Sequence, residues 1–80
     1  MTEYMRGKVK FAVKWYEYSN EQYPEGRAVH QDELFTELTD LGIKAANKNM
    51  DADFDEICIL LDRLEKGEEL NLSSLPEFAI

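Results

Sequence analysis

The stretch KVKFAVKWYEY, residues 8–18, decides the fold class that this sequence predicts. Apolar and polar side chains alternate along most of it. The first set is Val9, Phe11, Val13 and Trp15, and the second is Lys8, Lys10, Lys14 and Tyr16, with Ala12 among them. A period of two is typical of a β-strand with one buried face. The stretch therefore predicts an N-terminal strand whose valines, phenylalanine and tryptophan face the core.

The segment that follows predicts a turn and a return of the chain. Residues 19–27 are polar, and Pro24-Glu25-Gly26 suits a turn because proline presets φ and glycine tolerates a tight exit. A short second strand at residues 27–30 could pair with the first. Residues 68–72, EELNL, could add a short last strand.

A helical period replaces the alternation in residues 30–42. The apolar positions there are Leu34, Phe35, Leu38 and Leu41. Their spacing places the three leucines on one face of a helix. Gly42 suits the C-terminal cap, and Asp32 and Glu33 fall in the first turn, where the helix dipole favours acids.

A second helix is predicted to start at Asp51 or Asp53, to run to about Lys66 and to end at Gly67. One face holds Phe54, Ile57, Cys58, Leu61 and Leu64, with Leu60 at its edge. Cys58 would then be a packed, unreactive thiol. Residues 43–50 before it are ambiguous between a loop, a short strand and one helical turn. The acids at the start of the helix would cap free N–H groups.

These elements predict one small α+β domain over residues 1–80. The N-terminal amphipathic strand would lie in a small antiparallel sheet, packed against two amphipathic helices. The alternative is a mainly helical fold with the strand at an edge or paired with a second copy, so self-association is possible. The apolar tail SSLPEFAI, residues 73–80, is expected to pack down on the domain.

Charge is distributed unevenly along the chain. The formal net charge is −8, with about +3 in residues 1–16 and about −11 in residues 17–80. An acidic surface repels nucleic acid and attracts basic protein surfaces, although it can also serve solubility alone. The sequence therefore favours a partner protein with a basic surface and makes nucleic acid an unlikely one.

Chemistry other than binding has little support in the sequence. There is one histidine and one cysteine, too few for a zinc site, and no nucleophile has a base in a recognisable motif. Asp51-x-Asp53-x-Asp55 begins like a calcium loop, but its sixth and twelfth positions are Glu56 and Asp62 instead of Gly and Glu. We expect no enzyme activity, no catalytic or metal-binding residue and no cofactor. With no signal peptide, no membrane span and one cysteine, the expected location is the cytoplasm.

Nine residues are candidates for contact with a partner. Three of them form an acidic stripe on the first helix, and the other six, one of them apolar, lie on the second. They are Glu33, Glu37, Asp40, Asp51, Asp53, Asp55, Glu56, Ile59 and Asp62. Ile59 lies opposite the apolar face of its helix, so it is either covered on that side too or an anchor for a partner.

Three functional hypotheses follow. The first is an inhibitor that docks its acidic helices on a basic, nucleic-acid-binding surface of another protein, by analogy of size and charge with phage inhibitors of restriction and CRISPR systems. The second is a housekeeping interaction module or regulatory subunit without nucleic-acid mimicry. The third is weak binding of single-stranded nucleic acid through the lysines and tyrosines of the strand.

Overall fold

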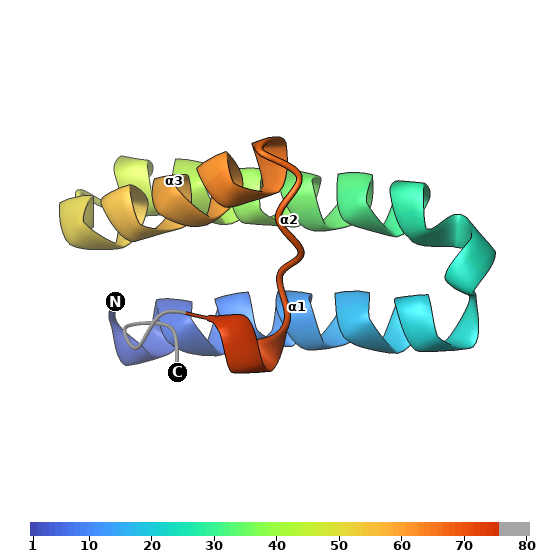
Figure 1. The fold of residues 1–80 in the computed structure, drawn as a ribbon. Coiled ribbons are helices and arrows are strands. Elements are labelled where there is room, and N and C mark those ends of the chain that lie inside the picture. The colour runs from blue at the N-terminus through green and yellow to red at the C-terminus, as the bar shows by residue number, and fades with distance from the viewer. Residues whose placement is uncertain (76–80) are drawn as a thin grey trace.

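The computed structural model describes residues 1–75, which form three α-helices and two short 3₁₀ turns (Figure 1). The helices are α1 (Glu3–Gln22), α2 (Arg27–Asn47) and α3 (Asp51–Glu65), and the 3₁₀ turns are η1 (Pro24–Gly26) and η2 (Leu72–Ser74). Residues 1–75 contain no strand, so the predicted α+β fold with its antiparallel sheet is wrong.

The predicted strand is the middle of helix α1. Two rows of apolar side chains follow this helix, each at helical spacing. The buried row is Met5, Val9, Ala12, Val13 and Tyr16, and the exposed row is Tyr4, Phe11, Trp15 and Tyr18. Val9 and Val13 are an i, i+4 pair of the buried row. Phe11 and Trp15 are an i, i+4 pair of the exposed row, shifted by two residues. Together the two pairs place an apolar residue at every second position, as in a strand, although each pair has the spacing of a helix.

Helix α2 is longer at both ends than predicted. Its first turn takes in residues 27–30, which were expected to form a strand, and its last turns take in most of the ambiguous segment 43–50. Gly42 is a buried interior residue, not the cap, and an added Cβ there would lie 3.5 Å from Ile57 Cγ2 of α3. The helix ends instead at Asn47, with Lys48 as its C-cap, and the following Asn49 has a φ of 59°. The Asn49 and Met50 N–H groups donate to the Ala46 and Ala45 carbonyls in a Schellman motif.

Helix α3 confirms the predicted second helix, which starts at Asp51 and ends in a Schellman motif at Gly67 with a φ of 82°. The predicted capping is wrong, because the N-cap is Met50, which offers no side-chain hydrogen bond. Asp51 and Asp53 lie in the first turn, where they face the positive end of the helix dipole. Cys58 is exposed, in contrast to its predicted packing.

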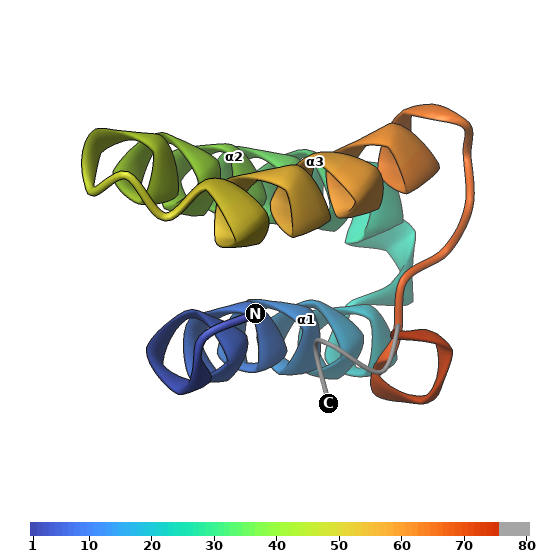
Figure 2. The same ribbon diagram turned by 90° about the vertical axis from the view of Figure 1, so that its left-hand side faces the viewer.

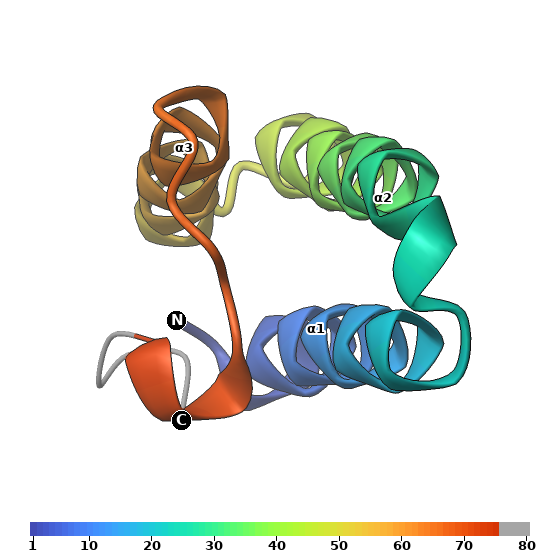
Figure 3. The ribbon, with the colours of Figure 1, turned by 45° about the vertical axis from the view of Figure 1, so that its right-hand side comes forward.

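Helix α2 lies beside both other helices and makes most of the contacts between helices (Figure 3). Past α3, the chain crosses to α1 and forms η2 beside it (Figure 2). Leu70 and Leu75 on this crossing segment are buried in the common core, and the Leu72 N–H donates to Glu17 of α1. Residues 68–71 connect α3 to η2 without forming the predicted strand. Of the tail expected to pack down, residues 76–80 lie outside the described residues.

No helix within residues 1–75 combines the length and the apolar character needed to cross a membrane.

Replacing Gly7 by Ala is expected to raise the free energy of unfolding by about 1 kcal/mol. Gly7 is an exposed interior residue of α1, and an added Cβ would meet no atom within 4 Å. Glycine in a helix interior costs about 0.8–1 kcal/mol relative to alanine. Urea unfolding followed by circular dichroism measures the difference, and a destabilised variant would contradict a helical α1.

Candidate functional site: a groove between helices α1 and α2

An open groove of about 650 Å³ runs between helices α1 and α2. Its lining comes from residues 11–19 of α1 and residues 29–37 of α2. The two helices run antiparallel along the groove (Figure 1). The two helices are joined by the tight turn at η1, where the Gly26 N–H donates to the Tyr23 carbonyl. The predicted turn at Pro24–Gly26 is therefore confirmed, and it sets α1 and α2 side by side (Figure 1).

Phe11 and Trp15 of α1 line one side of the groove, and with the neighbouring Tyr18 they form what we call the aromatic ridge. Phe11 is 71% exposed and Trp15 is 58% exposed, although both are large apolar side chains. The Trp15 and Tyr18 rings stack with their centroids 5.6 Å apart. A second, smaller hollow of about 390 Å³ lies on the ridge, between these three rings and Lys14. Aromatic side chains this exposed and this close together are typical of a protein-binding surface.

The other side of the groove is an acidic wall formed by Asp32, Glu33 and Glu37 of α2. Glu33 and Glu37 are one helical turn apart, and both are exposed. Within residues 1–75, neither carboxylate has an ion-pair partner. Val29 adds an apolar contact to this wall and is 59% exposed. The groove therefore has exposed apolar side chains along its α1 side and negative charge along its α2 side.

His30 lies at the end of the groove nearest the turn. Its Nδ1 is 2.9 Å from Oδ1 of Asn20 on α1, and this contact bridges the two helices. A Cβ at Gly26 would come within 3.1 Å of the His30 ring, so the glycine leaves room for the ring. The single histidine of the chain has a structural role here.

The nine predicted partner residues do not form one surface. Glu33 and Glu37 line the groove, and Asp40 is exposed one turn further along α2. Four others are exposed on what we call the outer face of α3. This face consists of Asp51, Asp55, Ile59 and Asp62. The groove is lined by α1 and α2 alone, so the outer face of α3 is a separate surface.

Ile59 is 49% exposed on that outer face, as the anchor hypothesis requires. Asp62 is less available than predicted, because its Oδ2 lies 2.9 Å from the Lys66 ammonium group. The hydrogen bond and charge of Asp62 raise the pKa of Lys66 above its usual value. The ion pair reduces the negative charge of the outer face. Because solvent screens an exposed pair, it contributes little to the stability of the fold.

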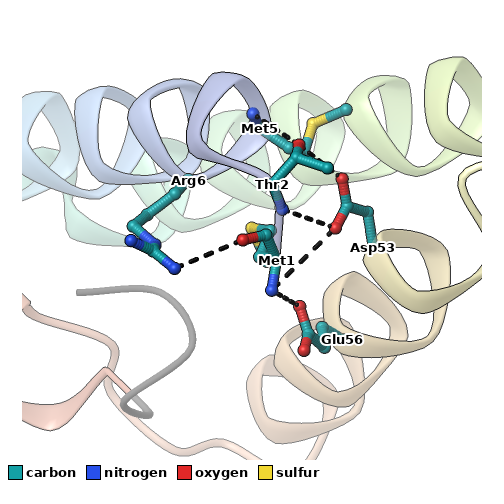
Figure 4. Close-up of polar contacts among 6 residues, drawn as sticks. All are labelled: Met1, Thr2, Met5, Arg6, Asp53 and Glu56. Carbon is teal, nitrogen blue, oxygen red and sulfur yellow. Dashed lines mark hydrogen bonds and ion pairs between the residues drawn. The ribbon is translucent and has the colours of Figure 1, made fainter.

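The remaining two residues, Asp53 and Glu56, point inward and bind the N-terminal segment (Figure 4). Asp53 is 2% exposed, and its two oxygens accept from the Thr2 N–H at 2.8 Å and from the Thr2 hydroxyl at 2.7 Å. The Thr2 hydroxyl in turn accepts from the Met5 N–H and caps α1. Glu56 Oε2 lies 2.7 Å from the Met1 ammonium nitrogen. Both acids therefore connect α3 to the segment that begins α1, and their contact with a partner stays a prediction.

The aromatic side of the groove is what the sequence analysis missed. Phe11 and Trp15 were assigned to the core because of the apparent strand. A signal for the correct assignment is present: Tyr4, Phe11, Trp15 and Tyr18 recur at intervals of seven, four and three residues, as one helix face requires. The true core row of α1 has the same kind of spacing, and periodicity alone does not say which row is buried.

The lysines proposed to bind single-stranded nucleic acid lie on helix α1 and not on a strand, and nothing in the structure tests that binding. On a helix with 100° per residue, Lys8 lies far around the axis from Lys10 and Lys14. The ammonium groups of Lys8 and Lys48 lie 5.6 and 5.5 Å from the centre of the Tyr4 ring. The lysines of α1 therefore do not share one face, but Lys14 lies beside the rings of Phe11, Trp15 and Tyr18, and Lys8 lies beside that of Tyr4.

Residues 1–75 contain no group of three His, Cys, Asp or Glu side chains placed to hold a metal ion. Asp51, Asp53 and Asp55 belong to the first turns of α3, with Asp53 turned inward, so they form no calcium loop. No protein-family model, curated protein or solved structure matches this chain. No relative's activity therefore bears on the groove.

Proposed function

We propose that this protein acts by binding another protein, and that the groove between α1 and α2 holds a basic, partly apolar segment of that partner. By covering the segment, the protein would inhibit a partner that uses the same basic surface to bind nucleic acid. The proposal includes a cytoplasmic location, with which the free Cys58 is compatible.

The observation that carries the proposal is the pairing of an exposed aromatic ridge with an unpaired acidic wall. Solubility accounts for acids anywhere on the surface, but it does not account for Phe11 and Trp15 in water. Interfaces are enriched in exposed aromatic anchors, while charges at their edges guide association and select the partner. The aromatic ridge supplies the aromatic anchors, and the acidic wall supplies the charges at the edge.

The structure narrows the acidic surface available for such binding. Asp53 and Glu56 are taken up by the N-terminal segment, and the outer face of α3 lies apart from the groove. Glu33, Glu37 and Asp40 of α2 remain beside the aromatic ridge or close to it. We therefore propose docking through the acids of α2 and the aromatic side chains of α1, in place of docking through the acids of α2 and α3 together.

Reversing the charge of Glu33 and Glu37 to Lys is expected to abolish complex formation. The experiment captures the partner from source-cell extract on the wild-type chain and then measures its affinity for purified variants. The matched control is Asp55→Lys with Asp62→Lys, which gives the same net charge but changes only the outer face of α3. The control is expected to retain the partner.

The same complex should weaken when the salt concentration rises. At about 0.15 M ionic strength the screening length is about 8 Å, so charges at the edge of an interface lose much of their attraction as salt is added. Calorimetric titration at several salt concentrations provides the measurement. Affinity that is insensitive to salt, or equal loss of binding in the two charge-reversal variants, would contradict the proposal.

A further inference from the structure

We propose that the occupant of the groove is an amphipathic α-helix of the partner, carrying bulky apolar residues along one face and Arg or Lys along the flank beside α2. This inference rests on the proposed function and adds the conformation and the residue pattern of the bound segment. The argument comes from the walls of the groove, their spacing and their charge.

The walls leave little for an extended segment to bind. Both are long α-helices, Glu3–Gln22 and Arg27–Asn47, whose interior backbone groups are bonded within their own helix. One way in which an extended peptide binds is by pairing with the free edge of a sheet, and residues 1–75 contain no sheet. A buried extended backbone would therefore leave its own N–H and C=O groups unpaired, at a cost. A helical segment already pairs these groups internally.

The spacing of the walls matches a helix. Phe11 and Trp15 are four residues apart on α1, and Glu33 and Glu37 are four residues apart on α2. At 1.5 Å per residue, each pair is separated by about 6 Å along its axis. Side chains at i and i+4 of a bound helix have the same separation, so two apolar residues can meet the aromatic ridge while two basic residues meet the acidic wall. On each helix the lined stretch covers nine residues, and its eight steps of 1.5 Å correspond to about 12 Å, or about two turns.

The surroundings of α2 are compatible with this arrangement. Helix α2 packs against α3 and the core through Leu38, Leu41 and Ala45, whereas Glu33 and Glu37 lie on the side of the groove. A bound helix would lie against α1 and α2 from outside and extend the three-helix arrangement by one helix. It would cover the aromatic side chains that residues 1–75 leave exposed.

Charge selects a basic partner over a second copy of this chain. Two copies, each with a net charge of −8, repel each other. A basic segment instead gains from both the local wall and the overall charge.

Trp15 makes the proposal directly measurable. It is the only tryptophan of the chain and it lies on the aromatic ridge, so its fluorescence reports occupancy of the groove. The probes come from two displayed libraries of tryptophan-free peptides of about 16 residues, long enough for about four helical turns. One library has a helix-forming frame with one randomised face. The other is identical except for a central proline, which breaks the helix.

We expect the helix-forming library to yield binders with bulky apolar residues at i, i+4 and i+7 and Arg or Lys on one flank. Their binding should shift the Trp15 emission to shorter wavelength, and the central proline should weaken them at least about tenfold, because proline costs a helix interior about 3 kcal/mol. Phe11→Ala should weaken binding about 30-fold, as loss of an interface anchor does. Glu33→Gln with Glu37→Gln should weaken it about tenfold, and Asp55→Asn with Asp62→Asn should leave it within about twofold.

The possible outcomes separate this inference from the proposed function. Proline-containing peptides that bind equally well would overturn the helical occupant and leave the proposed function standing. Acidic or uncharged binders, or an absence of any peptide that shifts Trp15, would overturn both. A chain that forms dimers in sedimentation, with Trp15 already shielded, would show that a second copy occupies the groove and would also overturn the inference.

Discussion

Replacement of Asp53 by Ala is expected to lower the free energy of unfolding by about 2–3 kcal/mol. The carboxylate accepts two hydrogen bonds from Thr2, and hydrogen bonds to a charged group contribute about 1.5–3 kcal/mol each before relaxation and water access reduce the loss. In a domain of this size the change corresponds to about 10–20 °C in Tm. Thermal and urea unfolding provide the measurement.

Asp55→Ala is the matched control for that experiment. Asp53 and Asp55 lie two residues apart in α3, so both substitutions gain the same helix propensity from alanine. Asp55 is exposed, so its replacement should change stability by less than about 0.5 kcal/mol. A double-mutant cycle with Thr2→Val should give a coupling energy of about 1–2 kcal/mol. Additive effects, or equal effects of the two Asp variants, would show that the contact between α1 and α3 does not stabilise the fold.

Replacement of Leu38 by Ala is expected to cost about 2–5 kcal/mol, whereas replacement of Trp15 by Ala should cost less than about 1 kcal/mol. Leu38 is fully buried on α2, and its removal leaves a cavity in a small core. Trp15 is 58% exposed and loses mainly its contact with Tyr18 when replaced. The comparison inverts the usual order, in which the larger aromatic residue is the more costly to remove.

Urea unfolding of the two variants tests which side chains form the core. The strand prediction places Trp15 in the core, so it requires Trp15→Ala to destabilise the protein by as much as Leu38→Ala does. Similar losses in the two variants would contradict the helical α1 and remove the aromatic ridge from consideration. If Trp15→Ala retains stability but fails to bind the selected peptides, the side chain serves the groove and not the fold.

The sequence predicted α3 and the middle of α2 because their signals are local. Leucines at i, i+4 and i+7 identify one face of α2, and a glycine that tolerates a positive φ ends α3 at Gly67. The C-terminal end of α2 was missed because Asn49, not Gly42, adopts the left-handed conformation. Gly42 instead serves the close approach of α2 to Ile57 of α3, a requirement that depends on packing.

The candidate site was predicted only in part. Glu33 and Glu37 were identified from their spacing on one helix face. The same rule placed Ile59 opposite the apolar face and left open whether it is covered; it is 49% exposed. The contacts of Asp53 and Glu56 were not predicted because their partners, Thr2 and Met1, lie about fifty residues away in the chain. Local rules place a carboxylate on a helix, but they do not reveal which distant segment folds back on it.

By itself the sequence determined the acidic net charge, the turn at Pro24–Gly26 and the existence of two amphipathic helices, since each depends on composition or on residues within two helical turns of one another. Only the tertiary structure decided the conformation of residues 8–18. That stretch carries two apolar rows offset by two residues, so its pattern agrees with a strand as well as with a helix. Packing of Val9 and Val13 against α2 buries one row and leaves Phe11 and Trp15 in water beside Glu33 and Glu37. The groove exists because contacts between helices, made by residues far apart in the chain, select which row forms the core.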